Sequence, residues 1–368
     1  MTPTAGPSAA DLDVSFLAMV GDWRRGGAGC DDAGFDAHAR ALFVHQVERN
    51  EPYARYAESC GFTLARQPRT WREIPAVPSS AFKDATLATF DVARAELEFH
   101  TSGTTADRVG KHFVERAELY DASLAAGFDR FMLADRPKLR FLNLVPNPRH
   151  NKRSSLGYMV GHVSLLCGDG RAAYFVEDDA IDVAGFLLAF EDAVREAAPV
   201  GMTGTAFAFA GLLDALDERK KSFAAPPGSR IMETGGFKGR ARVVAQDELY
   251  RRLEAALGIP QTSVVAEYGM TELLSQYYDS VESRSSPTRI KAAPPWLRTL
   301  VVDNAGREVA PGEIGTLRHF DLANRSSVVA VQTEDRGYAA QGGIVLLGRD
   351  VDAPPRGCSL GAEDLART

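Results

Sequence analysis

From Leu139 onward, short apolar runs alternate with longer amphipathic segments, and this alternation limits the possible folds more than any other feature of the sequence. The longer segments have helical periodicity, and Thr203 or Thr205 is a candidate N-cap for one of them. Strands that alternate with helices predict an α/β fold, in which mixed parallel sheets are flanked by helices and ligands bind at strand ends. The expected strands lie within 140–145, 172–176, 229–236 and 263–269, and the expected helices within 181–198, 204–221 and 244–260.

The rest of the chain predicts two further regions. Residues up to about 75 are polar, with apolar residues near helical spacing, and two prolines in IPAVPSSAF (74–82) interrupt this pattern. The segment 299–322 instead has short β-type runs separated by Asn, Gly and Pro turns. We therefore expect a helical region over residues 1–75, an α/β core over 76–295 and a small β-rich region over 296–368.

Composition argues against several classes of function. The 368 residues carry a formal net charge of −7 without a basic stripe, so we expect no nucleic-acid partner. No apolar run has the length of a bilayer span and the N-terminus lacks the pattern of a signal peptide, so we expect a cytoplasmic protein without a membrane partner. Cys30, Cys60, Cys167 and Cys358 form no CxxC pair and have no matching histidines, which disfavours a zinc site or a disulfide framework.

Hydroxyl groups are concentrated in TSGTT, residues 101–105, and Lys111 follows a few residues later. Such a run can form a nest of donors for an anion, because glycine lets the backbone approach the ligand closely. It lacks the spacing of a Walker A loop, because six residues separate Gly103 from Gly110 and His112 follows the lysine. Taken alone, such a run is more commonly a hydrogen-bonded polar turn.

A second motif, VVAEYGMTE (264–272), is a strand that continues into a turn. It places Tyr268, Thr271 and Glu272 close together in the chain. An aromatic ring can stack on a base, a hydroxyl can contact phosphate, and a carboxylate can hold Mg²⁺ through its oxygen atoms. Alone, the motif is equally compatible with Thr271 or Glu272 beginning the next helix.

Together, the two motifs resemble the adenylate-forming superfamily of acyl-CoA synthetases, adenylation domains and luciferases. The resemblance implies ATP and Mg²⁺ as cofactors: the TSGTT loop would hold the ATP phosphates, the tyrosine would flank adenine, and the threonine would contact the α-phosphate. Three further segments match the family: METGGFKGR (232–240) as the turn that packs on adenine, and TEDRGY (333–338) and LGRD (347–350) as ribose-binding segments. The implied nucleotide-binding residues are Thr101, Ser102, Gly103, Thr104, Thr105, Gly235, Gly236, Phe237, Glu267, Tyr268, Gly269, Met270, Asp335 and Arg349, and the implied metal ligand is Glu272.

Within the superfamily, the chain is similar to the acyl-protein synthetases of the LuxE type, relatives of phenylacetate-CoA ligases that lack the large C-terminal domain. The similarity includes IPAVPSSAFK (74–83), ETGGFKGR (233–240) and PPRGCSL (354–360). In the bioluminescence enzymes, a cysteine near the C-terminus receives the acyl group and passes it to a partner reductase, and Cys358 is the matching position. The resemblance therefore implies an acyl-accepting tail, in which a thiolate favoured by Arg356 would attack the acyl-adenylate.

Two departures from the superfamily concern its lysines. ADRVGKH replaces the usual Pro-Lys-Gly end of the phosphate loop, and the sequence ends at residue 368, so we expect the lysine of the mobile C-terminal domain to be absent. Lys111 and Lys238 are candidates to neutralise charge on the α-phosphate, although Lys238 could equally be a surface residue. With Thr271 and Cys358, these lysines are the candidate catalytic residues.

The expected activity is ATP-dependent conversion of a carboxylic acid to acyl-AMP with release of pyrophosphate, followed by transfer of the acyl group to a thiol. That thiol is Cys358, a carrier protein or a partner reductase. Two alternatives stay open: a compact acyl- or aryl-CoA ligase that does not acylate itself, and a degenerate nucleotide-binding subunit of an acyl-transfer complex. The sequence does not identify the acid, fatty or aryl, the final acceptor or the oligomeric state.

Overall fold

The computed structural model describes residues 7–101, 109–133, 135, 138–178, 180–235 and 245–349. The chain forms two compact units that alternate along the sequence. The first unit contains Met1–Ala126, Met270–Gln276 and Ala293–Thr368, and the second contains Gly127–Gly269 and Tyr277–Ala292. The domain boundaries expected from the sequence stay predictions.

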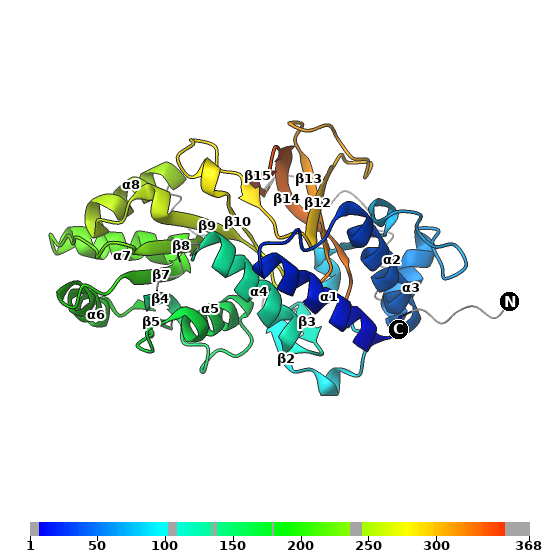
Figure 1. Ribbon diagram of the computed structural model, residues 1–368, viewed down its shortest axis with the longest axis horizontal. Coiled ribbons are helices and arrows are strands. Elements are labelled where there is room, and N and C mark those ends of the chain that lie inside the picture. The colour runs from blue at the N-terminus through cyan, green and yellow to red at the C-terminus, as the bar shows by residue number, and fades with distance from the viewer. Residues whose placement is uncertain are drawn as a thin grey trace. The chain divides into compact units, whose positions relative to one another are not determined.

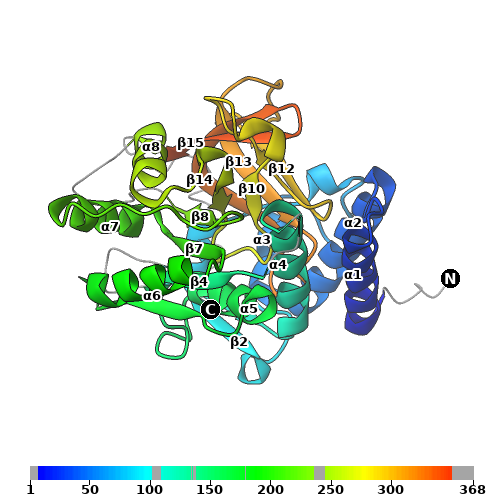
Figure 2. The ribbon, with the colours of Figure 1, turned by 60° about the vertical axis from the view of Figure 1, so that its left-hand side comes forward.

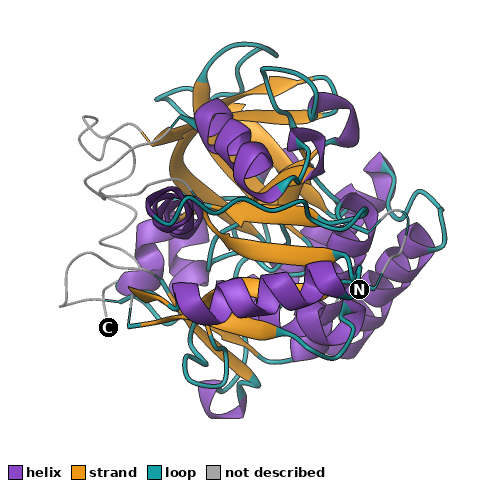
Figure 3. Cartoon of the chain, turned by 90° about the vertical axis from the view of Figure 1, so that its left-hand side faces the viewer, coloured by secondary structure: helices purple, strands orange, loops and turns teal. Residues whose placement is uncertain are grey.

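The second unit is built on a mixed sheet, drawn in orange with the other strands in Figure 3. Its strands are β4 (Arg140–Pro146), β5 (Ala173–Glu177), β6 (Ala180–Ile181), β7 (Val200–Thr205), β8 (Arg230–Thr234), β9 (Val264–Tyr268), β10 (Tyr277–Asp279) and β11 (Lys291–Ala292). They follow one another in the order β11-β10-β9-β8-β7-β4-β5-β6. Strands β5, β4, β7, β8 and β9, which are neighbours in that order, pair parallel. β6 pairs antiparallel with β5, β10 with β9, and β11 with β10. The predicted parallel centre is therefore confirmed.

Helices cover this sheet and share a core with it. They are α5 (Ser155–Cys167), α6 (Val183–Arg195), α7 (Ala206–Glu218) and α8 (Gln246–Leu257), followed by the 3₁₀ turns η4 (Gln261–Ser263) and η5 (Val281–Ser283). Figure 1 shows α6, α7 and α8 beside β4, β7 and β8. Phe190 of α6, Leu213 of α7 and Leu253 of α8 are fully buried together with Leu142 of β4. Removal of such side chains from water is the main force that holds helices on a sheet.

Local sequence accounts for the ends of the helices in the second unit. The Thr205 side chain accepts a hydrogen bond from the backbone N–H of Ala208 at 3.1 Å, so Thr205 is the N-cap of α7. Helix α8 ends at Gly258, whose φ of 69° lies in the left-handed region. The cap at Thr205 confirms one of the two candidates named from the sequence.

The first unit combines helices with antiparallel strands. Its helices are α1 (Ala9–Arg24), α2 (Asp32–Arg49) and α3 (Glu51–Ser59), with η1 (Trp71–Glu73), η2 (Ser79–Lys83) and η3 (Val92–Arg94). Its strands are β1 (Val77–Pro78), β2 (Leu97–His100), β3 (Lys111–Val114), β12 (Leu297–Val302), β13 (Gly315–Asp321), β14 (Ala330–Ala340) and β15 (Gly343–Arg349). β12 to β15 pair antiparallel in chain order, β1 pairs parallel with β14, and β2 and β3 form a separate ribbon. Helices α1 to α3 precede the strands of this unit in the chain, and β12 to β15 follow them (Figure 2).

Two further features complete the fold. Helix α4 (Ala117–Phe131) begins in the part of the chain assigned to the first unit and ends in the part assigned to the second. In the first unit, Trp296 is fully buried and packs edge-on against Phe16 and Trp23 of α1. Among the residues that the structure describes, no helix has both the length and the apolar character needed to cross a bilayer.

Candidate active site

In the second unit, β9 carries the first part of the VVAEYGMTE motif. All of its residues are buried, as expected for a strand inside a covered sheet. Thr234 of the neighbouring strand β8 lies opposite Glu267, and the Thr234 hydroxyl donates a hydrogen bond to the Glu267 carboxylate. The ring of Tyr268 packs against Tyr277 of β10, with ring centroids 5.6 Å apart. Adjacent strands thus orient the side chains at the carboxyl end of β9.

Gly235 directly follows β8 and has φ = 63°, a left-handed conformation that side-chain-bearing residues adopt at a cost. It is the first glycine of the METGGFKGR turn. The remaining turn residues of the predicted site, Gly236, Phe237 and Lys238, lie outside the described residues. The structure therefore describes only the start of the turn that the resemblance assigns to adenine.

The second part of the motif lies in the first unit, in the loop formed by Met270–Gln276. Thr271 is partly exposed, and the Glu272 residue is 7% exposed. The backbone carbonyl of Thr271 accepts a hydrogen bond from Nδ1 of His112 at 2.7 Å, and that of Glu272 accepts one from Nδ2 of Asn324 at 2.9 Å. These bonds hold the backbone of the two residues that the family resemblance places at the α-phosphate and at Mg²⁺.

The base of the TSGTT loop is closed by backbone and side-chain hydrogen bonds. Thr101 N–H donates to the carbonyl of Gly110 at 2.9 Å, and Gly110 N–H donates to Oγ1 of Thr101 at 3.0 Å. A Cβ on residue 110 would lie only 2.9 Å from Thr101 Oγ1, which explains the glycine there. Ser102, Gly103, Thr104 and Thr105 lie outside the described residues.

Lys111 begins β3 at the same end of the ribbon. Its side chain is 52% exposed, and Nζ lies 3.8 Å from the Glu98 carboxylate. Glu98 also lies 2.7 Å from Nε2 of His100. An exposed lysine with one distant partner keeps most of its capacity to meet an anion, because exposed ion pairs stabilise only weakly.

Asp335 and Arg349 face each other across β14 and β15. Nε of Arg349 donates to Oδ1 of Asp335 at 3.0 Å, and Asp335 is 4% exposed. Burial lowers the pKa of Arg349, but attraction to Asp335, Glu334 and Glu272 outweighs this effect and raises it. The first unit thus brings the expected ribose-binding pair into the electrostatic neighbourhood of the expected magnesium ligand.

Three buried polar residues around the Met270–Gln276 loop were not expected from the sequence: His112, Asp321 and Asn324. Asp321 accepts hydrogen bonds from the backbone N–H of Leu274 at 2.8 Å and from the hydroxyl of Ser275 at 2.7 Å. Burial raises the pKa of Asp321 to about 6, although these bonds lower it in part. Burial lowers the pKa of His112, and its contacts with Thr271 and Asn324 offset this effect only in part. A sequence signal existed only for the DLANRSS segment (321–327), a polar run between two strands.

The chemistry of the described residues fits Mg²⁺ that arrives with a nucleotide. Among the described residues, no cluster of three or more His, Cys, Asp or Glu side chains could hold a metal by itself. Mg²⁺ in nucleotide sites is usually held by one or two carboxylates together with phosphate oxygens and water. A single buried carboxylate such as Glu272 is therefore a suitable protein ligand.

Solved structures with this fold are adenylate-forming enzymes. An open conformation of 2-hydroxyisobutyryl-CoA ligase in complex with 2-HIB-AMP and CoA has a TM-score of 0.65 at 15% identity, and the similarity covers 87% of this chain and 70% of that chain. ATP-bound MatB from Rhodopseudomonas palustris has a TM-score of 0.51 at 17% identity, with 71% of this chain and 49% of that chain covered. The chain therefore has the fold of an adenylate-forming enzyme.

Sequence similarity then identifies the family. Residues 32–362 match the family described as "Acyl-protein synthetase, LuxE", and the chain belongs to that family. It is 21% identical to a protein of Vibrio harveyi over 82% of this chain and 78% of the relative, and 22% identical to one of Aliivibrio fischeri over 83% and 79%. Both relatives are named long-chain-fatty-acid--luciferin-component ligase. The protein is thus a ligase that activates a carboxylic acid with ATP as acyl-AMP and transfers the acyl group to an acceptor.

Proposed function

We propose that the motif residues have the roles implied by the adenylate-forming family. In the second unit, Gly235 and Tyr268 contact adenine. In the first unit, Asp335 and Arg349 bind the ribose hydroxyls, and Thr271 contacts the α-phosphate. The remaining phosphates are bound by the loop residues Thr101, Ser102, Gly103, Thr104 and Thr105 and by Lys111. The residues that line the nucleotide are Gly236, Phe237, Glu267, Gly269 and Met270. Lys238 is a further cation near the phosphates.

One observation carries this proposal. Arg349 is hydrogen-bonded to Asp335 at 3.0 Å and is attracted by Glu272, so three residues from three separate motifs lie in one electrostatic environment. Asp335 is only 4% exposed, and burial of a charge costs free energy unless the charge has a specific partner. An ion pair that only stabilises the protein surface would not need so buried an aspartate. The arrangement fits a pair that presents a carboxylate and a guanidinium to a polar ligand.

The chemistry consists of two displacements. A carboxylate oxygen of the acid attacks the α-phosphorus of ATP, and the bond from that phosphorus to the bridging oxygen breaks, so that pyrophosphate leaves. A thiolate then attacks the acyl carbon, and AMP leaves with the electron pair of the acyl–oxygen bond. The thiol proton passes to solvent. The main task of the protein is to stabilise charge on the phosphates, for which Lys111 and Mg²⁺ bound by Glu272 are suited.

The final acceptor belongs to the proposal as well. We place the first transfer on Cys358, from which the acyl group passes to a carrier protein or a partner reductase. Cys358 lies outside the described residues. Its assignment therefore depends on the family resemblance of PPRGCSL, and direct transfer to coenzyme A is the competing route.

The first experiment measures pyrophosphate release from MgATP with a panel of carboxylic acids, with hydroxylamine present to trap the activated acyl group. The panel begins with long-chain fatty acids, because both bacterial relatives are named as ligases of such acids, and continues with short and aryl acids. Acid-dependent release together with hydroxamate formation is the expected result. A protein that binds MgATP but releases no pyrophosphate with any acid would contradict the proposal.

The second experiment tests Cys358→Ala. We expect the variant to keep acid-dependent pyrophosphate release but to lose the protein-bound thioester that radiolabelled acid forms on the parent enzyme. Cys60→Ala is the matched control, because Cys60 is an exposed cysteine at a distant position in the sequence. Thioester formation that survives in Cys358→Ala would move the acylation site to another cysteine. A parent enzyme that forms no protein-bound thioester would favour direct transfer to coenzyme A.

A further inference from the structure

A buried polar pair holds the backbone of Thr271 and Glu272. His112 is 1% exposed and Asn324 is 0% exposed, and both belong to the first unit. They lie 159 and 52 positions away from the residues that they bind, so that the pair joins three separate segments of the chain. Two adjacent carbonyl groups in one turn are thus bound by two side chains that themselves contact each other.

The β2–β3 ribbon explains why His112 points into the unit. Neighbouring residues of a strand face opposite sides, and Lys111 is 52% exposed whereas His112 is buried. Nδ1 of His112 donates to the Thr271 carbonyl at 2.7 Å, and Nε2 lies 3.0 Å from Oδ1 of Asn324. The ring also packs edge-on against Phe82, with centroids 5.5 Å apart. The strand that follows the TSGTT loop is thereby connected to the Thr271–Glu272 turn.

Asn324 completes the connection with both ends of its amide. Its Nδ2 donates to the Glu272 carbonyl at 2.9 Å, while its Oδ1 faces His112. Because the Glu272 carbonyl can only accept, Nδ2 is the end of the amide that faces it, and Oδ1 therefore faces His112. A hydrogen bond from Nε2 to Oδ1 also needs a proton on Nε2, because Nδ1 already donates its proton to the Thr271 carbonyl. A buried amide with both ends engaged restrains the neighbouring backbone strongly.

We propose that His112 and Asn324 are positioning residues that orient Glu272 toward a nucleotide-bound divalent cation and Thr271 toward the α-phosphate. The inference rests on the proposed function of Thr271 and Glu272. Neither His112 nor Asn324 touches the nucleotide in this scheme. They act by holding the turn, as residues behind a metal ligand commonly do, and loss of such support typically costs about 10- to 100-fold in metal affinity.

Asn324→Asp is the sharpest test. The substitution keeps the shape of the side chain and the acceptor that faces His112, but it replaces the donor to the Glu272 carbonyl with a second oxygen. Asn50→Asp is a matched control, because Asn50 is 1% exposed and its Nδ2 donates to the Ser327 carbonyl at 3.3 Å rather than to a carbonyl of the Thr271–Glu272 turn. His112→Phe provides a second variant that removes the hydrogen bond to the Thr271 carbonyl and the contact with Oδ1 of Asn324, and keeps a ring against Phe82.

The readouts are the Mg²⁺ dependence of pyrophosphate release and calorimetric ATP binding with and without Mg²⁺. For Asn324→Asp we expect the Mg²⁺ concentration at half-maximal rate to rise about 10- to 100-fold, with a lower kcat. Its KM for the acid and its metal-free ATP affinity should stay within about twofold of the parent, because uniform substrate binding is not altered. His112→Phe should change in the same direction, and Asn50→Asp should keep the parental Mg²⁺ dependence.

Two outcomes would overturn the inference: an unchanged Mg²⁺ dependence in Asn324→Asp and His112→Phe, or equal losses in Asn324→Asp and Asn50→Asp. The calorimetric readout also separates this inference from the proposed function. If no acid elicits pyrophosphate release from the parent, the proposed function fails. The effect of Asn324→Asp on Mg²⁺-dependent ATP binding still decides the role of the pair.

Discussion

At the scale of single residues, Asp335 and Arg349 show how a pair can be held ready for a polar ligand. Asp335→Asn removes the negative charge and weakens a charged hydrogen bond of 3.0 Å to Arg349. Hydrogen bonds to charged groups contribute about 1.5–3 kcal/mol, so we expect ATP affinity to fall roughly 10- to 100-fold. Calorimetry measures this directly, and an unchanged dissociation constant for ATP would remove Asp335 from the ribose site.

Glu272→Gln tests the metal ligand itself. The amide keeps the size of the side chain but is a much poorer ligand for Mg²⁺ than a carboxylate. We expect kcat for pyrophosphate release to fall about 100-fold or more, because electrostatic stabilisation of the phosphates is lost. ATP binding without Mg²⁺ should stay near the parental value. Full activity at the parental Mg²⁺ concentration would show that another residue holds the metal.

At the scale of elements, two glycines with similar backbones have different surroundings. Gly258 ends α8 with φ = 69°, and a Cβ there would lie 3.0 Å from backbone atoms of Phe223 and Ala224. Gly235 directly follows β8 with φ = 63°, and none of the residues that the structure describes lies within 4 Å of a Cβ there. Gly235→Ala should therefore cost only the left-handed strain, about 1 kcal/mol, and Gly258→Ala about 2 kcal/mol or more. Urea denaturation compares the two variants, and equal losses would mean that the 223–224 segment moves aside freely.

The β13 strand carries a pH-sensitive group on its buried face. His319 is 0% exposed, and burial lowers its pKa from 6.5 to about 4 despite the nearby Asp335. The unfolded chain therefore takes up a proton near pH 6.5 that the folded chain takes up only near pH 4. Stability from this group is fully present above pH 6.5 and is lost as the pH falls to 4. A pKa difference of about 2.5 corresponds to roughly 3 kcal/mol.

His319→Gln isolates this contribution. Asp321 has the opposite effect, because its raised pKa of about 6 favours the folded chain as the pH falls from 6 to 4. The pH dependence of the parent's unfolding free energy therefore contains the contributions of both His319 and Asp321. The difference in unfolding free energy between parent and His319→Gln should shrink by roughly 3 kcal/mol between pH 7 and pH 4. A difference that does not change with pH would mean that the pKa of His319 is the same in the folded and in the unfolded chain.

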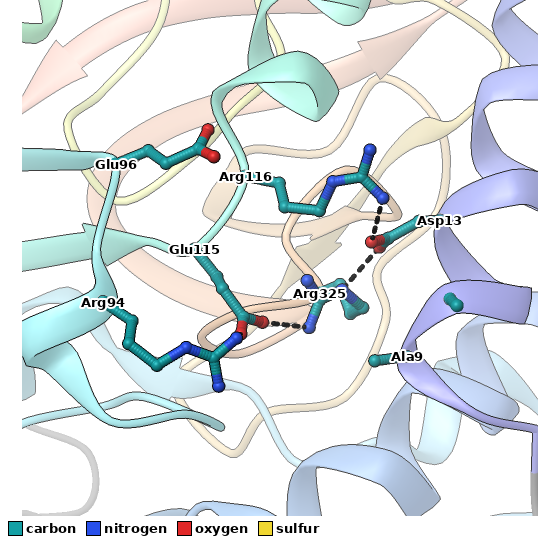
Figure 4. Close-up of a pocket in the computed structure, with 8 residues that line it drawn as sticks. Ala9, Asp13, Arg94, Glu96, Glu115, Arg116 and Arg325 are labelled. Atoms are coloured by element: carbon teal, nitrogen blue, oxygen red, sulfur yellow. Dashed lines mark hydrogen bonds and ion pairs between the residues drawn. The ribbon is translucent and has the colours of Figure 1, made fainter.

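At the scale of the whole molecule, a charged network ties distant segments of the first unit together (Figure 4). Arg325 is 3% exposed and pairs with Asp13 of α1 and with Glu115, which follows β3. Arg116 also reaches Asp13 at 3.2 Å. Burial raises the pKa of Asp13, and the two arginines oppose this effect. The hollow lined by these residues contains as many acidic as basic groups, so its charged side chains carry no net charge.

Arg325→Met tests the network. The substitution leaves the buried Asp13 carboxylate with only one arginine partner, so we expect a loss of about 3 kcal/mol in unfolding free energy. Arg307→Met is the control, because Arg307 pairs with Asp303 while its side chain is 80% exposed, and it should cost less than about 1 kcal/mol. Urea denaturation measures both. A similar small loss in both variants would show that solvent enters the Arg325 site and screens its charge.

Much of the second unit could be predicted from the sequence because its signals are local. Helix α7 has its cap at Thr205, and α8 has its stop at Gly258, each within a few residues of the periodic segment that it ends. Helix α5 was not predicted, because its run of apolar residues lacks a polar face and resembles a buried strand as much as a helix. The roles of Lys111 and Cys358 stay predictions, since neither follows from local pattern.

The α/β alternation and the order of the nucleotide motifs can be read from the amino-acid sequence alone, and the order of motifs is enough to identify the adenylate-forming class. Both are properties of residues that lie near one another in the chain. The packing of distant segments, in contrast, turns His112 inward and Lys111 outward and brings Asn324 to the Glu272 carbonyl. His112 and Asn324 are 212 positions apart, and such a contact depends on which strand face is buried and on how distant segments pack. No periodicity within either segment contains that information.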